Sequence, residues 1–529
     1  MNIRTLLLSA TITATGIATA QPFAGRVLVL EEITPAGMPG LQSFAWGTHD
    51  GQWLLIGGRT DGLHRRQPPV SFLASGNNVN AYVVDPATWQ VWSASLNALP
   101  QDLLEQLQST NMEFEQQGTT LYCIGGYGYS PSNADHVTYA FLSAIDLPGV
   151  MDAIRNGTSI TPYFRQIADP RMAVTGGQLR KVGDHFNLVG GQRFMGRYNP
   201  MGPDFGPGFV QEYTNALRRF IILDDGVDLS IADYWTLVDT VNLHRRDYNL
   251  LPQIFPDGQE GLTVFSGVFR YDADLPWLNT VDIRGTDIAV NNSFEQRFNQ
   301  YHTAHASLYE GSTQTMRSIF FGGIGRYQPV AGGGVQDDPN VPFVNTISLV
   351  ESGRSGQMSK RAIGQMPALL GASAEFNPWP GTEQTSSGIL LQDAFAGDTV
   401  VLGHIVGGIE SSAPNIFFIN TGTQSTATNK VYRVLLVDPS TAVNDADRTE
   451  GALRVTTNGQ VLNIEASLQG NSAALVRLID STGRVVRHIA AGVGTGEHRW
   501  TVDMRDLAAG PYLIEVRDEH LLLTRRIMH

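Results

Sequence analysis

The chain has 529 residues, a formal net charge of −14 at pH 7 and one cysteine. The acidic charge argues against nucleic acid or an anionic membrane surface as a partner. One cysteine cannot form a disulfide within the chain, so stability must come from a buried core, which a chain of this length can supply. Cys123 stands in a short apolar run and is expected to be a buried strand residue.

The first 20 residues, MNIRTLLLSATITATGIATA, have the pattern of a secretory signal peptide. A basic Arg4 precedes a short apolar stretch, and small residues at Ala18 and Ala20 form a cleavage site. No cysteine follows that site, which argues against a lipoprotein anchor. No other stretch approaches about 20 apolar residues. We therefore expect secretion across the inner membrane and no transmembrane segment in the mature chain.

Six short apolar runs recur along the next 400 or so residues, and five of them end in a glycine pair. They are WLLIGG, LYCIGG, FNLVGG, TVFSG, IFFGG and HIVGG, ending at Gly58, Gly126, Gly191, Gly267, Gly323 and Gly408. Each run is one strand long and rich in β-branched or aromatic residues. Glycine suits a point where a strand stops, turns and lets a neighbouring backbone come close. Repeats of this length predict an array of strand-rich units, here six blades in a ring.

The residues around these runs resemble the kelch family of β-propellers. WLLIGG is followed by NAYVVDPATWQVW, from Asn80 to Trp92, which is similar to the family's aromatic strand, Asp-Pro turn and closing Trp. DPRMAVTGG from Asp169 and HRRDYNLLPQIF from His244 are further matches. The pattern departs at Ser266-Gly267, and most repeats lack the closing Trp. The resemblance spans roughly residues 24–437 and implies a fold rather than a function.

The strands of single blades can be assigned from the sequence. Blade three is predicted as MAVTGGQLRKV, HFNLVGG, TNALRRFIIL and ADYWTLV. Blade six is predicted to begin near GILLQDAF and to continue with VVLGHIVGG and NKVYRVLLVD, leaving no fourth strand. We predict that Gly25–Ile33 supplies it by pairing beside Val431–Val437, because an unpaired blade edge leaves backbone groups unsatisfied.

Residues 438–451 are polar and turn-rich, which is typical of a linker, and residues 452–529 read as short alternating strands. This last segment resembles the type A sorting domain of type IX secretion substrates, found in Bacteroidetes. The matches are RLIDSTGRVV with Asp480 and Gly483, DLAAGPYLIEV around Gly510 and Tyr512, and the basic end from Arg525 to His529. The usual opening Asn-Pro is missing. The resemblance implies an immunoglobulin-like sandwich, the type IX machinery as partner, and an outer-membrane surface or extracellular location; a small adhesive sandwich is the alternative.

The predicted fold is therefore all-β: a signal peptide (1–20), a six-bladed kelch-like β-propeller (21–437), a linker (438–451) and a small immunoglobulin-like β-sandwich (452–529). Candidate ligand-binding residues lie in the long loops after the glycine runs. Three loops repeat an Arg-Tyr pair, Arg197-Tyr198, Arg270-Tyr271 and Arg326-Tyr327, while the second offers Tyr127 and Tyr129. Arg and Tyr supply a donor fork and a stacking ring for a ligand. Equally, an Arg stacked on Tyr can pin each loop to its neighbour, and both interpretations stay open.

At the expected channel entrances stand Arg171, Arg245, Arg246, Asp247, Tyr248, His302 and His305. The Arg246–Asp247–Tyr248 cluster with His302 suits either an internally paired network or an anionic ligand near the axis. His302 and His305 have no carboxylate ligand nearby in sequence, and the aspartates of LDDGVDLS lack the spacing of a calcium loop. We predict no metal site and no cofactor.

Two classes of function remain open, and a purely structural surface protein is a third possibility. The first is a secreted or cell-surface binding module for a glycan or protein ligand. The second is a propeller enzyme acting on a sugar at the channel mouth, mutarotase- or lyase-like, because kelch rings also carry such enzymes. Arg246, Asp247, Tyr248 and His302 could supply its acid, base and cation. No catalytic residue is assigned, and a copper-radical oxidase is disfavoured because Cys123 lies within a core strand.

Overall fold

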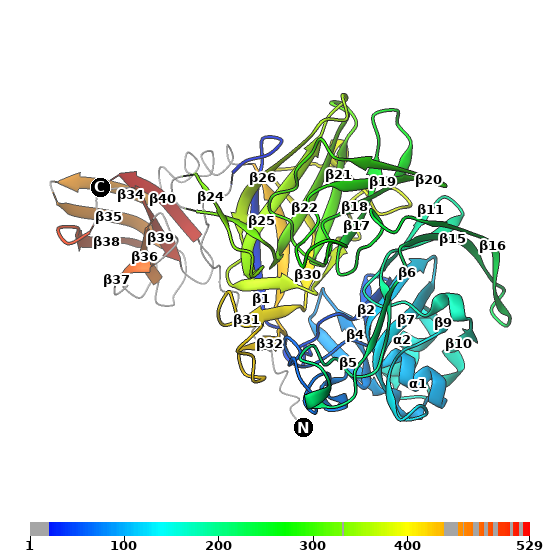
Figure 1. Cartoon of the computed structure of the whole chain (residues 1–529). Coiled ribbons are helices and arrows are strands. Elements are labelled where there is room, and N and C mark those ends of the chain that lie inside the picture. The colour runs from blue at the N-terminus through cyan, green and yellow to red at the C-terminus, as the bar shows by residue number, and fades with distance from the viewer. Residues whose placement is uncertain are drawn as a thin grey trace, which may run out of the picture. The chain divides into compact units, whose positions relative to one another are not determined.

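Figure 1 shows a computed structural model of the chain, in which almost all of the regular elements are antiparallel strands. It describes residues 21–330, 333–438, 453–458, 460–468, 475–480, 485–489, 496–507, 511–517 and 522–528. The predicted signal peptide, nearly all of the predicted linker, and Gly483, Gly510 and His529 lie outside these residues. The chain forms two compact units. The larger holds residues 32–395 and 401–434, and the smaller holds residues 435–529 together with residues 396–400 and 21–31.

Between residues 27 and 437 the chain forms six sheets of four or five strands, and consecutive sheets follow one another along the chain. The first is β2 (Ala45–His49), β3 (Gln52–Ile56), β4 (Asn80–Asp85) and β5 (Gln90–Ser95). The second is β6 (Thr110–Gln117), β7 (Thr120–Ser130), β9 (Phe141–Asp146) and β10 (Phe164–Ala168), with β8 (Asp135–Thr138) on β7. The third is β11 (Gln178–Val182), β12 (His185–Val189), β15 (Ala216–Asp224) and β16 (Leu229–Val238), which confirms the predicted strand order of that segment.

The last three sheets repeat this arrangement, except that one short strand of the fifth sheet comes after the first strand of the sixth sheet in the chain. The fourth is β17 (Asn249–Ile254), β18 (Glu260–Phe265), β19 (Thr280–Arg284) and β20 (Asp287–Asn291). The fifth is β21 (His305–Glu310), β22 (Thr315–Ile324), β25 (Phe343–Ser352) and β26 (Met358–Gln365), with β29 (Leu390–Leu391) beside β21. The sixth is β28 (Glu375–Pro378), β30 (Thr399–Val406), β33 (Val431–Val437) and β1 (Val27–Ile33).

The sixth sheet confirms one prediction and overturns another. β1 lies beside β33, as predicted from the missing fourth strand, and Tyr432 donates a hydrogen bond of 2.9 Å to Glu32. The first strand of this sheet is β28, so the prediction of that strand near GILLQDAF was wrong. Leu390 and Leu391 of that segment instead pair in parallel with β21 of the fifth sheet. Leu390 is buried there, and an apolar pair alone does not specify which sheet covers it.

The glycine pairs are joints between neighbouring sheets. Both glycines of each pair have positive φ, and where serine replaces the first, Ser266 also does, at 60°. A Cβ on Gly125 would lie 1.9 Å from the carbonyl oxygen of Val174, so only glycine permits this approach. Gly126 then donates its N–H to that same carbonyl, from the segment that enters the third sheet. The predicted close backbone approach is confirmed.

Two α-helices accompany the first two sheets, α1 (Gln101–Leu107) and α2 (Leu147–Asn156). α2 begins with proline in its first turn and ends at Gly157, whose φ of 66° closes the last turn. Short 3₁₀ turns occupy Ala74–Gly76, Leu96–Ala98, Thr161–Tyr163, Pro170–Met172, Pro203–Phe205 and Gln392–Ala394. No helix in the described ranges is long and apolar enough to cross a membrane.

The smaller unit is built mainly from two antiparallel sheets that share one core. One contains β34 (Leu453–Asn458), β35 (Val461–Leu468) and β38 (Gly496–Asp503). The other has the order β37 (Val485–Ile489), β36 (Leu475–Asp480), β39 (Pro511–Arg517) and β40 (Leu522–Met528). Buried residues of both sheets contact one another, among them Leu462, Ile464, Leu478, Trp500 and Ile514. The alternating pattern of the sequence therefore gives a two-layer β-structure.

Candidate functional site

Six residues at the starts of the first strands link the six sheets formed between residues 27 and 437. We call Ser43, Asn111, Gly176, Asp247, His302 and Ser373 the entry ring. Backbone hydrogen bonds of 2.8–3.2 Å run from N–H to carbonyl through the pairs Asn111–Ser43, Ser43–Ser373, Ser373–His302, His302–Asp247 and Asp247–Gly176. The remaining link is made by the hydroxyl of Thr175, which donates to the carbonyl of Asn111 at 3.1 Å. The chain of bonds thus returns to its starting point.

A small cavity of about 10 Å³ adjoins the entry ring, and its lining includes Glu113, His302 and Glu375 beside the apolar side chains of Phe44, Met112 and Phe114. This is room for about one water molecule. The imidazole Nε2 of His302 lies 3.2 Å from Oε1 of Glu375, forming a bond between the fifth and sixth sheets. His302 and Asp247, both predicted as site residues, are therefore brought to the same ring.

Glu113 is a buried carboxyl group, 2% exposed, in the first strand of the second sheet. Its Oε1 accepts a hydrogen bond of 2.8 Å from the N–H of Gly177, in the third sheet. Its Oε2 is buried and has no hydrogen-bond partner among the residues that the structure describes. Burial raises the pKa of Glu113 to about 8, which the bond from Gly177 only partly offsets, so the group is mostly protonated at neutral pH.

The segments after the glycine runs form six loops at the same end of the sheets as the entry ring. They are loop 1 (57–79), loop 2 (125–140), loop 3 (190–215), loop 4 (266–279), loop 5 (322–342) and loop 6 (407–430). Three of them carry hairpins, namely β13 (Gln192–Met195) with β14 (Val210–Tyr213), β23 (Tyr327–Pro329) with β24 (Val335–Asp337), and β31 (Ile409–Ser411) with β32 (Ser425–Ala427). β27 (Leu369–Ala372) pairs with β31. We call this set of loops the loop face.

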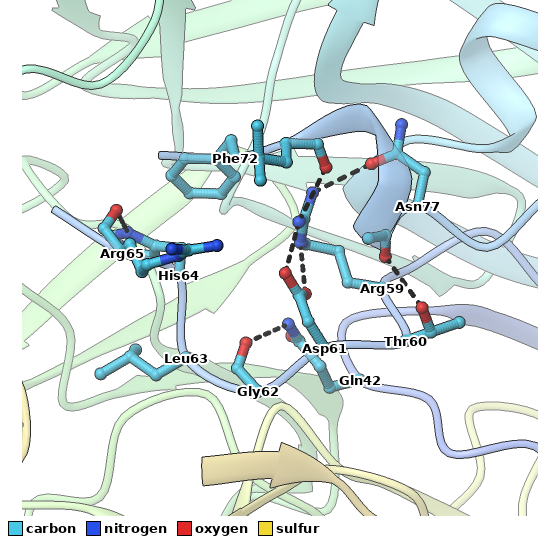
Figure 2. Close-up of polar contacts among 12 residues, drawn as sticks. Gln42, Arg59, Thr60, Asp61, Gly62, Leu63, His64, Arg65, Phe72 and Asn77 are labelled. Atoms are coloured by element: carbon cyan, nitrogen blue, oxygen red, sulfur yellow. Dashed lines mark hydrogen bonds and ion pairs between the residues drawn. The ribbon is translucent and has the colours of Figure 1, made fainter. Parts of the chain in front are cut away.

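Arg59 closes loop 1 at its base, as Figure 2 shows. Its guanidinium donates to Asp61 at 2.7 and 2.6 Å and to Oδ1 of Asn77 at 2.9 Å. It also donates to the carbonyl of Leu73 at 3.0 Å. The residue is only 2% exposed, and every bond stays within loop 1. Arg59 therefore ties the two ends of the loop together rather than facing a ligand.

His64 lies on the arm of loop 1 that Arg59 supports, close to Phe72 (Figure 2). The imidazole stacks on the ring of Phe72 with centroids 4.3 Å apart and meets Tyr198 of loop 3 edge-on at 5.1 Å. Burial lowers the pKa of His64 to about 4, and the charge of Arg59 acts in the same direction. The neutral ring has Nδ1 at 3.1 Å from the carbonyl of Arg65. With the proton on Nδ1, Nε2 is a hydrogen-bond acceptor.

Loop 1 is bonded to three other loops. The hydroxyl of Ser71 donates to the carbonyl of Tyr198 in loop 3 at 2.7 Å. His136 of loop 2 bonds the carbonyl of Phe72 through Nε2 at 2.9 Å. Asn420 of loop 6 donates to the carbonyl of Leu63 at 2.6 Å. These contacts hold loop 1 over its neighbours, so the loop face is one connected surface.

Arg246 joins loop 3 to the entry ring. Its guanidinium forms an ion pair with Asp247, donates to the hydroxyl of Tyr213 at 3.1 Å, and lies 5.3 Å above the ring of Phe269. Although burial disfavours the charged form, the neighbouring Asp247 raises the pKa of Arg246. Tyr248 lies in the core with 0% exposure and donates to the carbonyl of Val189, so its side chain is not accessible to a ligand.

The three predicted Arg-Tyr pairs differ in their surroundings. Arg197 donates to the carbonyl of Pro69 at 2.7 Å, so this pair links loop 3 to loop 1. Arg270 and Arg326 are each held by an aspartate of their own loop, Asp272 and Asp337, at 2.9 and 2.6 Å. Arg326 lies 5.1 Å above the ring of Tyr327, and Tyr271 is 58% exposed. The first pair is therefore bonded to another loop, whereas the arginines of the other two are held within their own loops.

Two other residues named at the entrances, Arg245 and His305, are committed to the scaffold. Arg245 is buried and donates to the carbonyls of Asn242 and Ser266. Burial lowers the pKa of His305 to about 3, and its Nδ1 bonds the carbonyl of Thr303. Within the described ranges, no group of three or more His, Cys, Asp or Glu side chains is placed to hold a metal ion. Cys123 is buried in β7, as predicted, and burial raises its pKa.

Sequence reasoning missed His64, Phe72, Glu113 and Glu375. The first two stand in the loop that follows the best-matching glycine pair, so their place in HRRQPPVSF was an available signal. Glu113 and Glu375 each stand two residues after an entry-ring residue, Asn111 and Ser373. This shared spacing could not be recognised from the sequence, because the entry ring is defined by hydrogen bonds between sheets. The candidate site is therefore the loop face with the entry ring beneath it.

No family model matches the chain, and no curated protein matches it. Among solved structures, the chain is similar to YjhT at 11% sequence identity and a TM-score of 0.41, with 74% of this chain and 95% of that chain covered.

Proposed function

We propose that the larger unit is a six-bladed, kelch-like β-propeller that binds a glycan or protein ligand at its loop face. In this proposal each of the six sheets is one blade, and the entry ring encircles the axis. Two observations support the ring: hydrogen bonds pass through all six sheets and return to the first, and β1 completes the last sheet. Full closure of this kind leaves only short, protected sheet edges.

The observation that carries the binding role is the gathering of rings and arginines on the loop face. Within loops 1 and 3, the rings of His64, Phe72, Tyr198 and Phe194 form one contiguous cluster. Exposed apolar side chains surround it, and Phe418 and Ile419 of loop 6 are 68% and 62% exposed. Such residues are enriched where proteins bind partners.

Replacing residues 63–72 of loop 1 by a Gly-Ser segment of equal length tests this role. The full-length mature chain is applied to arrays of glycans and of peptides, and we expect the replacement to abolish the strongest signal. Asp225→Asn in the β15–β16 turn, at the opposite end of the sheets, is the matched control and keeps binding. Binding that survives the loop 1 replacement and is lost in the control would show that the ligand does not bind at the loop face.

The titratable groups beside the entry ring favour a second candidate, a propeller enzyme acting on a sugar. They are a protonated carboxyl group, Glu113, and the His302–Glu375 pair, a set that suits proton transfer. NMR exchange measurements on a panel of reducing sugars test this candidate. Faster anomer exchange with the native chain, lost in Glu375→Gln, supports it, whereas exchange rates equal to those in buffer rule it out for those sugars.

We further propose that the protein is secreted, with residues 1–20 as signal peptide and residues 452–529 as a type IX sorting domain. The smaller unit supports this because it has its own two-sheet core, as a domain read by separate machinery requires. The proposal places the binding unit at the outer-membrane surface or outside the cell.

A further inference from the structure

Unpartnered polar atoms gather where loop 1 meets loop 3. Nε of Arg66, both amide atoms of Gln67 and Oδ1 of Asn199 are buried without a hydrogen bond to any described residue. Asn199 is 3% exposed. Native proteins satisfy nearly all buried polar groups, because leaving one unpaired is costly. Four such atoms in adjoining segments therefore point to a polar partner for this place.

Several contacts bring the two segments together. Pro68, next to Gln67, lies 4.0 Å from the position that a Cβ on Gly206 would take. The amide of Asn199 donates to the carbonyls of Gly206 and Pro207, both at 3.1 Å. The bonds from Arg197 to Pro69 and from Ser71 to Tyr198 clamp the same stretch. The unpartnered atoms thus belong to one junction.

Aromatic rings border this junction. Tyr198 meets the rings of His64 and Phe209, with centroids 5.1 and 5.7 Å apart. The guanidinium of Arg66 lies 4.4 Å above the exposed ring of Phe418. Apolar faces therefore stand beside groups that need directional polar partners.

We propose that the junction of loops 1 and 3 binds one residue of an uncharged, hydroxyl-rich glycan. Each sugar hydroxyl both donates and accepts, which fits a set made of an amide donor and acceptor (Gln67), an amide acceptor (Asn199) and a guanidinium donor (Arg66). The apolar C–H faces of a sugar ring pack on the aromatic rings. This inference rests on the proposed binding function and names its ligand class.

The charges of the junction argue against an anionic ligand or a protein segment as the occupant. Three neighbouring arginines are already occupied, Arg59 by Asp61, Arg246 by Asp247 and Arg197 by a backbone carbonyl. Three of the four unpartnered atoms belong to the uncharged amides of Gln67 and Asn199, and two of these, Oε1 of Gln67 and Oδ1 of Asn199, are acceptors that would repel an anion. The core of a protein–protein interface buries apolar anchor side chains, whereas this junction presents amide atoms that lack hydrogen-bond partners.

The test uses the full-length mature chain on an array of neutral, carboxylated and sulfated oligosaccharides, followed by calorimetry with the strongest neutral glycan. We expect the strongest signal from a neutral glycan and at least about tenfold weaker binding in Gln67→Ala and Arg66→Met. Arg284→Ala, beside the β19–β20 turn at the end of the fourth sheet opposite loop 4, is the control and keeps the native affinity. Melting temperatures verify that each variant is folded.

The outcomes separate this inference from the proposed function. A neutral glycan whose binding is unchanged in Gln67→Ala and Arg66→Met, but lost in Arg270→Ala of loop 4, overturns the inference while the loop face remains a binding surface. Signals from acidic glycans or peptides alone overturn the ligand class only. An array without any signal from the native chain overturns both.

Discussion

Glu113→Gln should stabilise the larger unit increasingly as pH rises. In the folded chain the pKa of Glu113 is raised from 4.5 to about 8, mainly by burial. Between these values the unfolded chain loses this proton while the folded chain keeps it, so the free energy of unfolding falls as pH rises. The slope is about 1.4 kcal/mol per pH unit, and the full shift corresponds to about 5 kcal/mol as an upper limit. Glutamine retains an oxygen for the N–H of Gly177 and has no proton to lose.

Denaturant titrations of the native and Glu113→Gln chains at pH 5, 6, 7, 8 and 9 measure this difference. We expect the two midpoints to approach each other at pH 5, to diverge up to about pH 8 and then to stay apart by a constant amount. Curves that run parallel from pH 5 to pH 9 would refute the assignment of a buried, protonated Glu113.

Glu105→Gln is the contrasting control for the same titration. Burial alone would raise the pKa of Glu105, but hydrogen bonds from Gln101, Ser130 and Ser132 outweigh it and lower the pKa. Its contribution is therefore present above the unfolded pKa and is lost as pH falls through the folded value. Relative to the native chain, this variant should lose stability at neutral pH and recover in acid, the opposite sign to Glu113→Gln.

Three further predictions concern the N-terminal strand β1, loop 1 and export. Deleting residues 21–34 removes β1 with its buried Leu28 and Ile33, and should lower the free energy of unfolding by about 3–6 kcal/mol. Denaturant titration measures this loss, and an unchanged midpoint would contradict a stabilising role for β1 in the sixth sheet. Arg59→Met should cost about 1–3 kcal/mol, because it leaves the buried Oδ1 of Asn77 and the carbonyl of Leu73 without their donor. It should also speed hydrogen exchange across residues 59–78, and unchanged exchange would show that Arg59 does not hold loop 1. Deleting residues 452–529 should leave a folded larger unit in the periplasm, and its appearance at the surface or in the medium would refute the sorting role.

The strands were predictable because their signals are local. Each apolar run ends where backbone geometry demands glycine, so the second strand of every sheet could be read from the chain. α2 was missed although LPGVMDAIRNG carries a proline in the first turn, apolar residues at helical spacing and a closing glycine. Those signals were outweighed by the strand-rich pattern on either side. Leu390 and Leu391 were misassigned because a two-residue strand has no periodicity.

The candidate site was less predictable because its residues are far apart in sequence and are brought together only by the hydrogen bonds of the entry ring and the contacts between loops. The Arg-Tyr repeat drew attention to three loops, but Asp272 and Asp337, within the same loops, already hold two of those arginines. Loop 1 has no such repeat, yet it contacts loops 2, 3 and 6. Which loop reaches over the others depends on tertiary contacts that sequence spacing does not encode.

Hydrogen exchange with and without the strongest array ligand tests the central claim most directly, because it locates the ligand without any substitution. If the ligand binds at the loop face, we expect slower exchange confined to residues 59–78 and 190–215, in loops 1 and 3, when the ligand is bound. Slower exchange in the β15–β16 turn or in the described strands of the smaller unit, with loops 1 and 3 unchanged, would contradict a ligand-binding loop face.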